Sequence, residues 1–364
     1  MAAIERLGVA GLIGGAALVA GGARGADLPE DSAETLYHSY TGGGVNAHGP
    51  AVLVRKSLAE KVSLSASYYV DRVSSASIDV VTTASPYKET RIQRGASLDI
   101  LAQDAIVSVT TSTSNEPDYK ADRTGIDVAQ DAFGGLTTIK LGATRGQDDV
   151  RRHGVPWFSA SASHWEYRLG ATQVLTPRLV AALNFEADAD TGYLGSPYRA
   201  ARVFGTLVPE RDPSTRTSRA VALRVTGAVG SSGSVRASYR YFYDTWNIHS
   251  GTAELGYGRH LGESWMVDAS VRHYHQTKAL FYSDNFTTEY NFMSRNRQLG
   301  TFSDNSLALS ASYRIPLVAG RSEFKVTGTV ERVRYRYDDF TDLRTGALYA
   351  FGATLAELSA MVSY

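Results

Sequence analysis

The sequence predicts an all-β protein, a transmembrane antiparallel up-and-down β-barrel, from three observations. Apolar and polar residues alternate along many segments, no stretch after residue 25 reaches about 18 consecutive apolar residues, and short connections alternate with long ones. Alternation with a period of two is typical of strands with one apolar and one polar face. In bacterial outer-membrane barrels the apolar face contacts the lipid bilayer and the short turns lie in the periplasm.

Composition excludes several other classes of protein. The chain has 364 residues, with 37 basic and 37 acidic side chains and no cysteine. Without cysteine there is no disulfide scaffold, thiolate metal site or thiol nucleophile. Nucleic-acid-binding proteins usually carry an excess of basic residues, and this chain has a net charge of zero. No nucleic-acid partner is therefore expected.

The first element along the chain is a predicted signal peptide, residues 1–25. Arg6 precedes an uncharged apolar run, and the small residues Ala23 and Gly25 occupy the −3 and −1 positions of a cleavage site. A membrane-spanning helix is the alternative, but the run is shorter than the roughly 20 residues that such a helix needs. Residues 26–364 are expected to form a single exported barrel domain.

Amphipathic strands follow the signal peptide. In the first clear strand, Val62, Leu64 and Tyr68 share one face, while Ser63 and Ser65 share the other. The pattern recurs over residues 165–172, 179–186, 221–226, 235–241 and 265–272. No helical pattern of comparable length is present, so strands are expected throughout.

The connections alternate in length along the chain. Short turns are predicted at residues 59–61, 103–104, 133–135, 176–177, 230–233, 261–263 and 319–321. Longer polar and aromatic segments separate them, at residues 74–90, 146–163, 189–217, 280–301 and 338–346. This asymmetry favours an outer-membrane barrel with short periplasmic turns and long external loops over a soluble β-sandwich.

Parity sets the expected number of strands at about 16. The strand before the 59–61 turn runs toward the periplasm, so a chain with both ends in the periplasm needs one earlier strand, and residues 34–43 are the only candidate. The last strand, residues 347–364, completes an even, closed count. Because residues 34–43 are glycine-rich and alternate poorly, 14 strands is the alternative.

The last strand also suggests a partner. Leu358, Ala360 and Val362 share the face of the terminal Tyr364. An amphipathic final strand that ends in an aromatic residue resembles the signal that outer-membrane barrels present to their assembly machinery. That machinery is therefore an expected partner, and an ordinary edge strand is the alternative reading.

Tyrosine is in excess, with 21 residues against 12 phenylalanines and 4 tryptophans. Aromatic rings with a polar tip favour the two membrane interfaces. Seven tyrosines are expected to face outward near strand ends: Tyr68, Tyr167, Tyr239, Tyr241, Tyr243, Tyr257 and Tyr335.

The inward face is expected to carry charges of both signs. Its members are Asp71, Glu166, Arg168, Glu186, Asp188, Arg224, Arg236, Arg240, Glu254, Asp268, Arg272, Lys325 and Glu331. A selective pore usually concentrates one sign of charge at its constriction. Mixed charges instead favour ion pairs across the lumen and a narrow or plugged interior.

Metal and catalytic sites have weak support. His273 and His275 share one strand face and could bind a metal, but their parity puts them outward at the rim without a third donor, which favours interfacial histidines. The pairs Asp148-Asp149 and Asp338-Asp339 lack an EF-hand pattern and are expected to be solvated loop charges. No G-x-S-x-G motif is present. Neither a cofactor nor an enzymatic activity is expected.

The long loops are expected to hold the main polar network. Arginine, carboxylate and aromatic residues can pack there through charge-assisted hydrogen bonds and stacking, outside the barrel or folded into it as a plug. The loop members are Arg199, Arg202, Arg216, Asp244, Asp284 and Arg295, and the lumen members are Arg236, Arg240, Asp268 and Arg272. A purely structural network without a ligand is the alternative.

These loops also carry a resemblance to a known family. The runs are residues 75–80, 173–176, 192–199, 213–218, 239–248, 281–284 and 291–295. With them the chain resembles the uncharacterised proteobacterial outer-membrane β-barrel family catalogued only as a domain of unknown function. The resemblance extends over nearly all of residues 26–364. It implies an outer-membrane location, brings no established activity, and implies neighbouring genes for a small lipoprotein and a flavin-attaching transferase.

Three functions are therefore open. The first is a porin-like channel or transporter for a small solute or a compound related to metals or redox cofactors. The second is a structural barrel that holds periplasmic or lipoprotein partners in the envelope, for example in extracytoplasmic electron transfer. The third is an outer-membrane hydrolase, whose catalytic groups would meet only in space.

Overall fold

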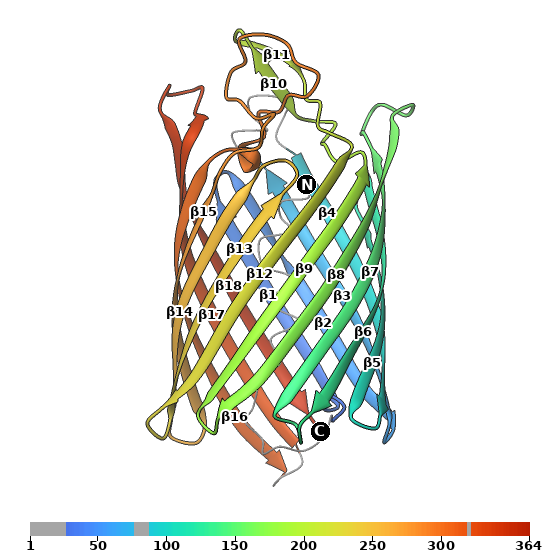
Figure 1. Ribbon diagram of the computed structural model, residues 1–364, viewed down its shortest axis with the longest axis vertical. Coiled ribbons are helices and arrows are strands. Elements are labelled where there is room, and N and C mark those ends of the chain that lie inside the picture. The colour runs from blue at the N-terminus through green and yellow to red at the C-terminus, as the bar shows by residue number, and fades with distance from the viewer. Residues whose placement is uncertain (1–26, 76–86, 319–321) are drawn as a thin grey trace.

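The computed structural model describes residues 27–75, 87–318 and 322–364, and within them sixteen strands form a closed antiparallel barrel (Figure 1). Each barrel strand pairs with the barrel strands that precede and follow it along the chain, and the first, β1 (Ser32–Gly42), pairs with the last, β18 (Leu348–Ser363), to close the barrel. The predicted fold and its count of 16 strands are confirmed, and the alternative of 14 is wrong. The predicted signal peptide and the turn at 319–321 lie outside the described residues.

The barrel strands are β1 (Ser32–Gly42), β2 (Val45–Ala59), β3 (Val62–Ser75), β4 (Tyr87–Ala102), β5 (Ala105–Asn115), β6 (Tyr119–Ala132), β7 (Thr137–Arg151), β8 (Ser159–Thr176), β9 (Leu179–Gly192), β12 (Thr215–Val229), β13 (Gly233–Asp244), β14 (His249–Leu261), β15 (Trp265–Gln276), β16 (Phe302–Val318), β17 (Ser322–Thr341) and β18 (Leu348–Ser363). The short strands β10 (Ala200–Val203) and β11 (Thr206–Pro209) form a separate hairpin. A single turn of 3-10 helix, η1, covers Arg297–Leu299. No helix among the described residues is long and apolar enough to cross a membrane.

Alternation along the strands separates the two faces of the barrel wall. On β3, Tyr68 is 43% exposed on the outside, whereas its neighbour Tyr69 is 6% exposed and points inward. Outward apolar side chains such as Leu223 and Leu309 stay exposed because they face lipid. The period of two in the sequence therefore reports the fold correctly.

One predicted outward tyrosine faces the lumen instead. Tyr335 is only 5% exposed and belongs to a buried aromatic cluster. It shares the parity of Lys325 and Glu331, which point inward, so its place near a strand end does not bring it to the lipid interface. The other six tyrosines of that prediction are exposed, which fits outward positions.

The two ends of the barrel differ as expected, with exceptions. The turns at one end are short, at residues 60–61, 103–104, 133–136, 177–178, 230–232 and 262–264. At the other end lie the longer connections 152–158, 193–214, 277–301 and 342–347, together with three short ones at 43–44, 116–118 and 245–248. The predicted loop over 146–163 is mostly strand, because β7 and β8 remain paired up to Arg151↔Ser159 although both faces are polar there.

The first and last strands meet at the end of the barrel that carries the short turns, which is the end expected to face the periplasm. Ser32 of β1 pairs with Ser363 of β18 at the end that carries the short turns, where the C-terminus is seen (Figure 1). The hairpin β10–β11 projects beyond the opposite, external end. Below we call residues 277–301 the mouth segment and residues 200–209 the cap hairpin.

Candidate functional site

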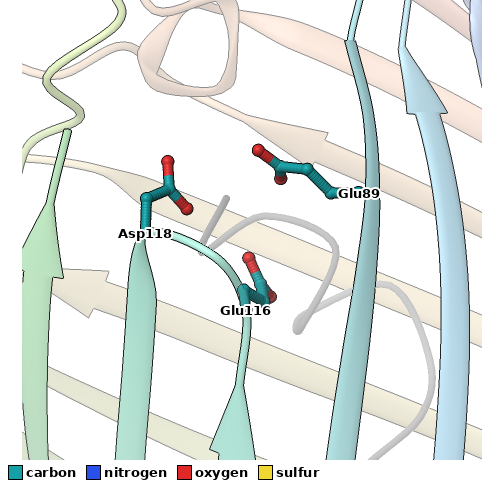
Figure 2. Close-up of side chains that lie close together, drawn as sticks. All are labelled: Glu89, Glu116 and Asp118. Carbon is teal, nitrogen blue, oxygen red and sulfur yellow. The ribbon is translucent and has the colours of Figure 1, made fainter. Parts of the chain in front are cut away.

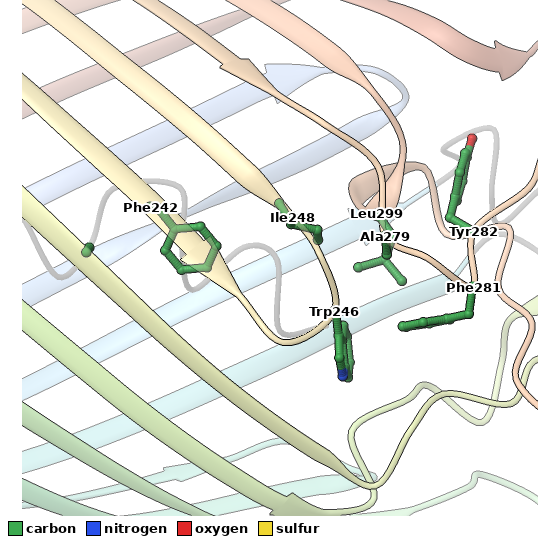
Figure 3. Packing of buried hydrophobic residues seen from close by; sticks show 8 residues of the cluster. Phe242, Trp246, Ile248, Ala279, Phe281, Tyr282 and Leu299 are labelled. Atoms are coloured by element: carbon green, nitrogen blue, oxygen red, sulfur yellow. The ribbon is translucent and has the colours of Figure 1, made fainter.

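The mouth segment packs against aromatic residues at the external end of β13 and β14. Phe281 meets Trp246 edge-on, with ring centroids 4.9 Å apart, and both are buried (Figure 3). The Trp246 indole N–H donates to the Thr215 carbonyl oxygen at 2.9 Å. The buried cluster comprises Ala220, Phe242, Trp246, Ile248, Ala279, Phe281, Tyr282 and Leu299. This burial ties the mouth segment to the barrel rim.

Arg216 and Asp244 reinforce the same region. The Arg216 Nε donates to Asp244 Oδ2 at 2.8 Å, and the guanidinium lies 4.6 Å from the Trp246 ring centroid. Asp244 Oδ1 accepts from the Ile248 backbone N–H at 2.8 Å and so fixes the tight β13–β14 turn. The structure therefore brings these two predicted network residues together.

A second aromatic cluster lines the inner wall of β17 and β18. It contains Val333, Tyr335, Tyr337, Phe340, Tyr349 and Ala353, with Phe351 packed against it. Two arginines of the mouth segment lie on this wall. Arg295 is 4.3 Å from the Phe340 ring centroid, and Arg297 is 5.3 Å from that of Phe351. Cation–π contacts of this kind hold the mouth segment against the inside of the barrel.

Arg295 joins three separate parts of the external end. Its Nε donates to the Asp284 carbonyl and carboxylate oxygens, both at 3.0 Å, and its Nη2 donates to the Thr341 carbonyl oxygen at 2.7 Å. Its backbone N–H donates to Glu210 Oε1 at 2.7 Å. Asp284 and Arg295, two members of the predicted loop network, thus form a pair that anchors the mouth segment.

The cap hairpin is joined to the mouth segment through the backbone. The Phe286 N–H donates to the Arg202 carbonyl at 2.7 Å, and the Phe204 N–H donates to the Phe286 carbonyl at 3.0 Å. Arg199 and Arg202 make no ion pair within the described part of the chain, so the expected network does not include their guanidinium groups as close partners. Arg199 acts at longer range on the nearby Asp212. Burial and the charge of Glu210 raise the Asp212 pKa to about 7, and Arg199 opposes this rise.

The lumen residues form ion pairs as the mixed charges predict. Arg236 donates through Nη2 to Asp268 at 2.8 Å, and its Nη1 reaches the other carboxylate oxygen. Arg240 pairs with Glu186 at 2.8 Å, and Arg272 pairs with Asp304 at 2.9 Å. Sequence reasoning missed Asp304, although its inward parity on β16 would have found it.

The opposite side of the lumen is lined by hydroxyl groups. A cavity of about 500 Å³ lies along β2 to β7. Ser65, Ser97, Ser108 and Thr110 contribute to its wall. The Arg55–Asp99 ion pair lies beside them, with Ser108 donating to Asp99 at 2.6 Å. The sequence shows these short polar residues but gives no sign that they surround an open space.

A larger hollow of about 780 Å³ lies between the external segments. Aromatic rings of Trp246, Phe281, Phe286, Tyr290 and Phe292 line it. The side chains of Asn285 and Asn291 also contribute to its lining. Sequence reasoning missed this hollow, because it forms only when the two long segments fold together.

Two predicted solvated acidic pairs are partly structural. Asp148 is buried on β7 and accepts a hydrogen bond from the Tyr119 hydroxyl, with His164 Nε2 2.7 Å away. Asp339 accepts from the Thr301 N–H at 2.8 Å. The prediction of solvated loop charge is wrong for these two, because each lies on a strand that extends beyond its expected end.

The histidines and one acidic cluster remain as possible metal ligands. His273 and His275 are exposed on the outer face, and His273 Nδ1 lies 2.9 Å from Asn305 Oδ1. Among the described residues, the group whose ligand atoms lie within 4.8 Å of one another is Glu89, Glu116 and Asp118 (Figure 2). Sequence reasoning missed this cluster, because Glu89 is separated from the other two along the chain.

A closed barrel with an apolar outer face, a charged lumen and a filled external mouth defines an outer-membrane β-barrel protein. Residues 159–327 match the family model described as "Protein of unknown function (DUF3570)". The match runs from the start of β8 into β17. It confirms the resemblance to an uncharacterised family.

Solved structures of outer-membrane proteins resemble the chain, and the first of those that follow shares its fold. A bacterial polysaccharide outer-membrane secretin is 10% identical, with a TM-score of 0.56 over 93% of this chain and 100% of that one. The siderophore receptor PirA from Pseudomonas aeruginosa is 10% identical over 92% of this chain and 81% of its own, with a TM-score of 0.44. The CymD monoaromatic hydrocarbon channel is 10% identical over 93% and 89%, also at 0.44. No curated protein matches the chain in sequence.

Proposed function

We propose that the protein is a channel or transporter for a small polar solute, with the mouth segment narrowing its external entrance. The observation that carries the proposal is the hydroxyl-lined cavity of about 500 Å³ inside the barrel. Hydroxyl groups can replace the hydrogen bonds that a polar solute loses when it leaves water.

The lumen is divided into two sides. On the side of β13 to β18, the mouth segment and aromatic side chains fill the external end. On the side of β2 to β7, the wall carries Ser65, Ser97 and Thr110 around the cavity. A solute therefore passes along β2 to β7. Because the charged lining residues are balanced, with Arg55 and Lys140 against Asp99 and Asp127, the passage favours a neutral or zwitterionic solute over a highly charged one.

Single-channel recording in planar bilayers tests the proposal. Thr110→Trp places a bulky ring in the cavity and should reduce the conductance of the wild type several-fold. Val109→Trp is the matched control, because Val109 is 42% exposed on the outer face of the same strand. Equal conductance of the two variants, or no current from the wild type and from a variant lacking residues 280–296, would refute the proposal.

A scaffold for envelope partners is the second candidate function. It is favoured by Phe204, which is 75% exposed at the turn of the cap hairpin. An aromatic side chain exposed on a projecting hairpin can insert into a pocket of a partner protein. Loss of a co-purifying partner on Phe204→Ser, without any change in conductance, would support this function over the first.

We also propose that the assembly machinery of the outer membrane binds the last strand through Tyr364. Tyr364 is exposed, and the Lys56 ammonium lies 4.8 Å from its ring centroid. Tyr364→Ser should lower the amount of barrel inserted in cells but not refolding of the purified chain in detergent. An equal loss in both assays would instead mean that Tyr364 serves stability.

A further inference from the structure

Three carboxylates meet at the external end of the barrel, away from the mouth segment. Glu89 lies near the start of β4, and Glu116 and Asp118 belong to the short β5–β6 connection (Figure 2). The connection reads Glu116-Pro117-Asp118, and proline at this position pre-sets the backbone for a tight turn. The Glu116 N–H donates to the Tyr119 carbonyl at 2.7 Å and closes the turn. The carboxylates therefore stand on a rigid backbone.

Asp118 is buried without compensation. It is 3% exposed, and neither of its carboxylate oxygens has a hydrogen-bond partner. The Tyr198 hydroxyl faces Asp118 from the external loop above but makes no hydrogen bond of normal geometry to it. The backbone of Asp118 is held in place, because its carbonyl accepts from the Arg151 N–H at 2.7 Å. A buried carboxylate without a partner is costly, so its oxygens are expected to have a ligand.

The other two carboxylates also have buried oxygens that lack hydrogen-bond partners. Glu89 and Glu116 each have one buried oxygen, Oε2, without a hydrogen-bond partner. Arg91 is the nearby cation, but its guanidinium lies 3.7 Å from Asp71 and 5.5 Å from the Tyr69 ring centroid. The cluster thus holds more negative charge than its surroundings neutralise.

We propose that Glu89, Glu116 and Asp118 bind a hard divalent cation, with Ca²⁺ as the preferred ion. Their ligand oxygens lie within 4.8 Å of one another. Two oxygens on opposite sides of one Ca²⁺ are about 4.6–5.2 Å apart, since Ca–O distances are about 2.3–2.6 Å. An all-oxygen ligand set suits Ca²⁺ and Mg²⁺, whereas zinc and copper sites usually include histidine or cysteine.

The ion would connect β4 to the β5–β6 connection at the external rim. Binding would lock the rim on the side of the lumen that holds the hydroxyl-lined cavity. The site does not depend on whether the barrel conducts, so its test is independent of the proposed function.

Calcium binding by the folded full-length barrel in detergent tests the proposal. After removal of divalent cations with EDTA, isothermal titration with CaCl₂ should show one saturable site per chain. Asp118→Asn and Glu116→Gln should each weaken the affinity at least tenfold. Asp122→Asn is the control, because Asp122 is an exposed carboxylate on β6 that pairs with Lys120 at 2.6 Å, and it should leave the affinity unchanged.

Heat-modifiable gel migration shows which variants are folded, and Glu89→Gln replaces any variant that is not. Absence of saturable Ca²⁺ binding by the wild type would overturn the proposal and indicate a cluster held by shared protons. Equal binding by Asp118→Asn and the wild type would also overturn it. Titration with MgCl₂ in place of CaCl₂ should give weaker binding, and tighter Mg²⁺ binding would overturn the preference for Ca²⁺.

Discussion

Replacement of Arg295 by alanine should release the mouth segment while leaving the barrel folded. Arg295 is 5% exposed, and its guanidinium donates to Asp284 in its own segment and to the Thr341 carbonyl on β17. It also lies on the ring of Phe340, which is fully buried. No barrel strand depends on these contacts for its pairing, so the loss should be local.

The size of the effect follows from the burial of the pair. Breaking a buried ion pair by removing one partner costs about 3–5 kcal/mol. The Asp284 side chain keeps 24% of its surface exposed and can be rehydrated, so the lower end, about 3 kcal/mol, applies. Since about 1.4 kcal/mol corresponds to a factor of ten, the released state should become roughly 150-fold more populated.

Amide hydrogen exchange of the folded barrel measures this release. The N–H groups of Phe286 and Ser294 are hydrogen-bonded within the closed arrangement and should exchange roughly 150-fold faster in Arg295→Ala, by the same factor of ten per 1.4 kcal/mol. Arg344→Ala is the control, because Arg344 is 60% exposed and forms its ion pair with Asp342 of its own loop, the β17–β18 connection. Unchanged exchange in Arg295→Ala, or equal acceleration in Arg344→Ala, would refute the reasoning.

Three further predictions concern the lumen, the acidic cluster and the lipid face. Arg236→Met should lower the free energy of unfolding in urea by about 1–2 kcal/mol by leaving Asp268 unpaired, and Asp268→Leu in the same chain should recover much of it. Protonated Glu116 contributes stability below its ordinary pKa of 4.5 that is lost as pH rises through about 7. Without divalent cations, the unfolding temperature should therefore fall from pH 5 to pH 8, and Glu116→Gln should flatten that fall. Leu358→Arg should make the free energy of folding into lipid vesicles less favourable by about 2 kcal/mol, because Leu358 faces the lipid. Ser359→Arg should leave it unchanged, because Ser359 faces the lumen.

The strands could be predicted from the sequence because the alternation of apolar and polar residues within each strand distinguishes its lipid-facing side from its lumen-facing side. At Tyr68 and Tyr69 the pattern alone separates lipid from lumen, and the short turns give the direction of each strand. The boundaries were less accurate where both faces become polar. Around Asp148 the alternation ends although the ladder continues, so the predicted loop was too long.

The candidate sites could be predicted only where one partner already carried a distinctive signal. Arg295 and Asp284 were found because they lie in one loop rich in charged and aromatic residues. Glu89 and Asp118 were missed because they approach only after β4, β5 and β6 have paired. The hydroxyl-lined cavity was missed for a different reason. Ser97 and Thr110 look like ordinary polar strand residues in the sequence, which does not show the open space between them and the opposite wall of the barrel.

The arrangement separates the stability of the barrel from the closure of its mouth. Strand pairing is continuous around the wall, with a local register shift between Arg336 and Thr341 of β17, where the mouth segment packs against it. Side chains such as Arg295 and Trp246 hold the mouth segment in place. Their contacts can break without loss of the hydrogen bonds between strands. The free energy needed to open the mouth is therefore that of a few local contacts, whereas unfolding requires all the ladders to break. A movement of the mouth segment by ligand binding or by mutation can consequently change access to the lumen while the barrel stays intact.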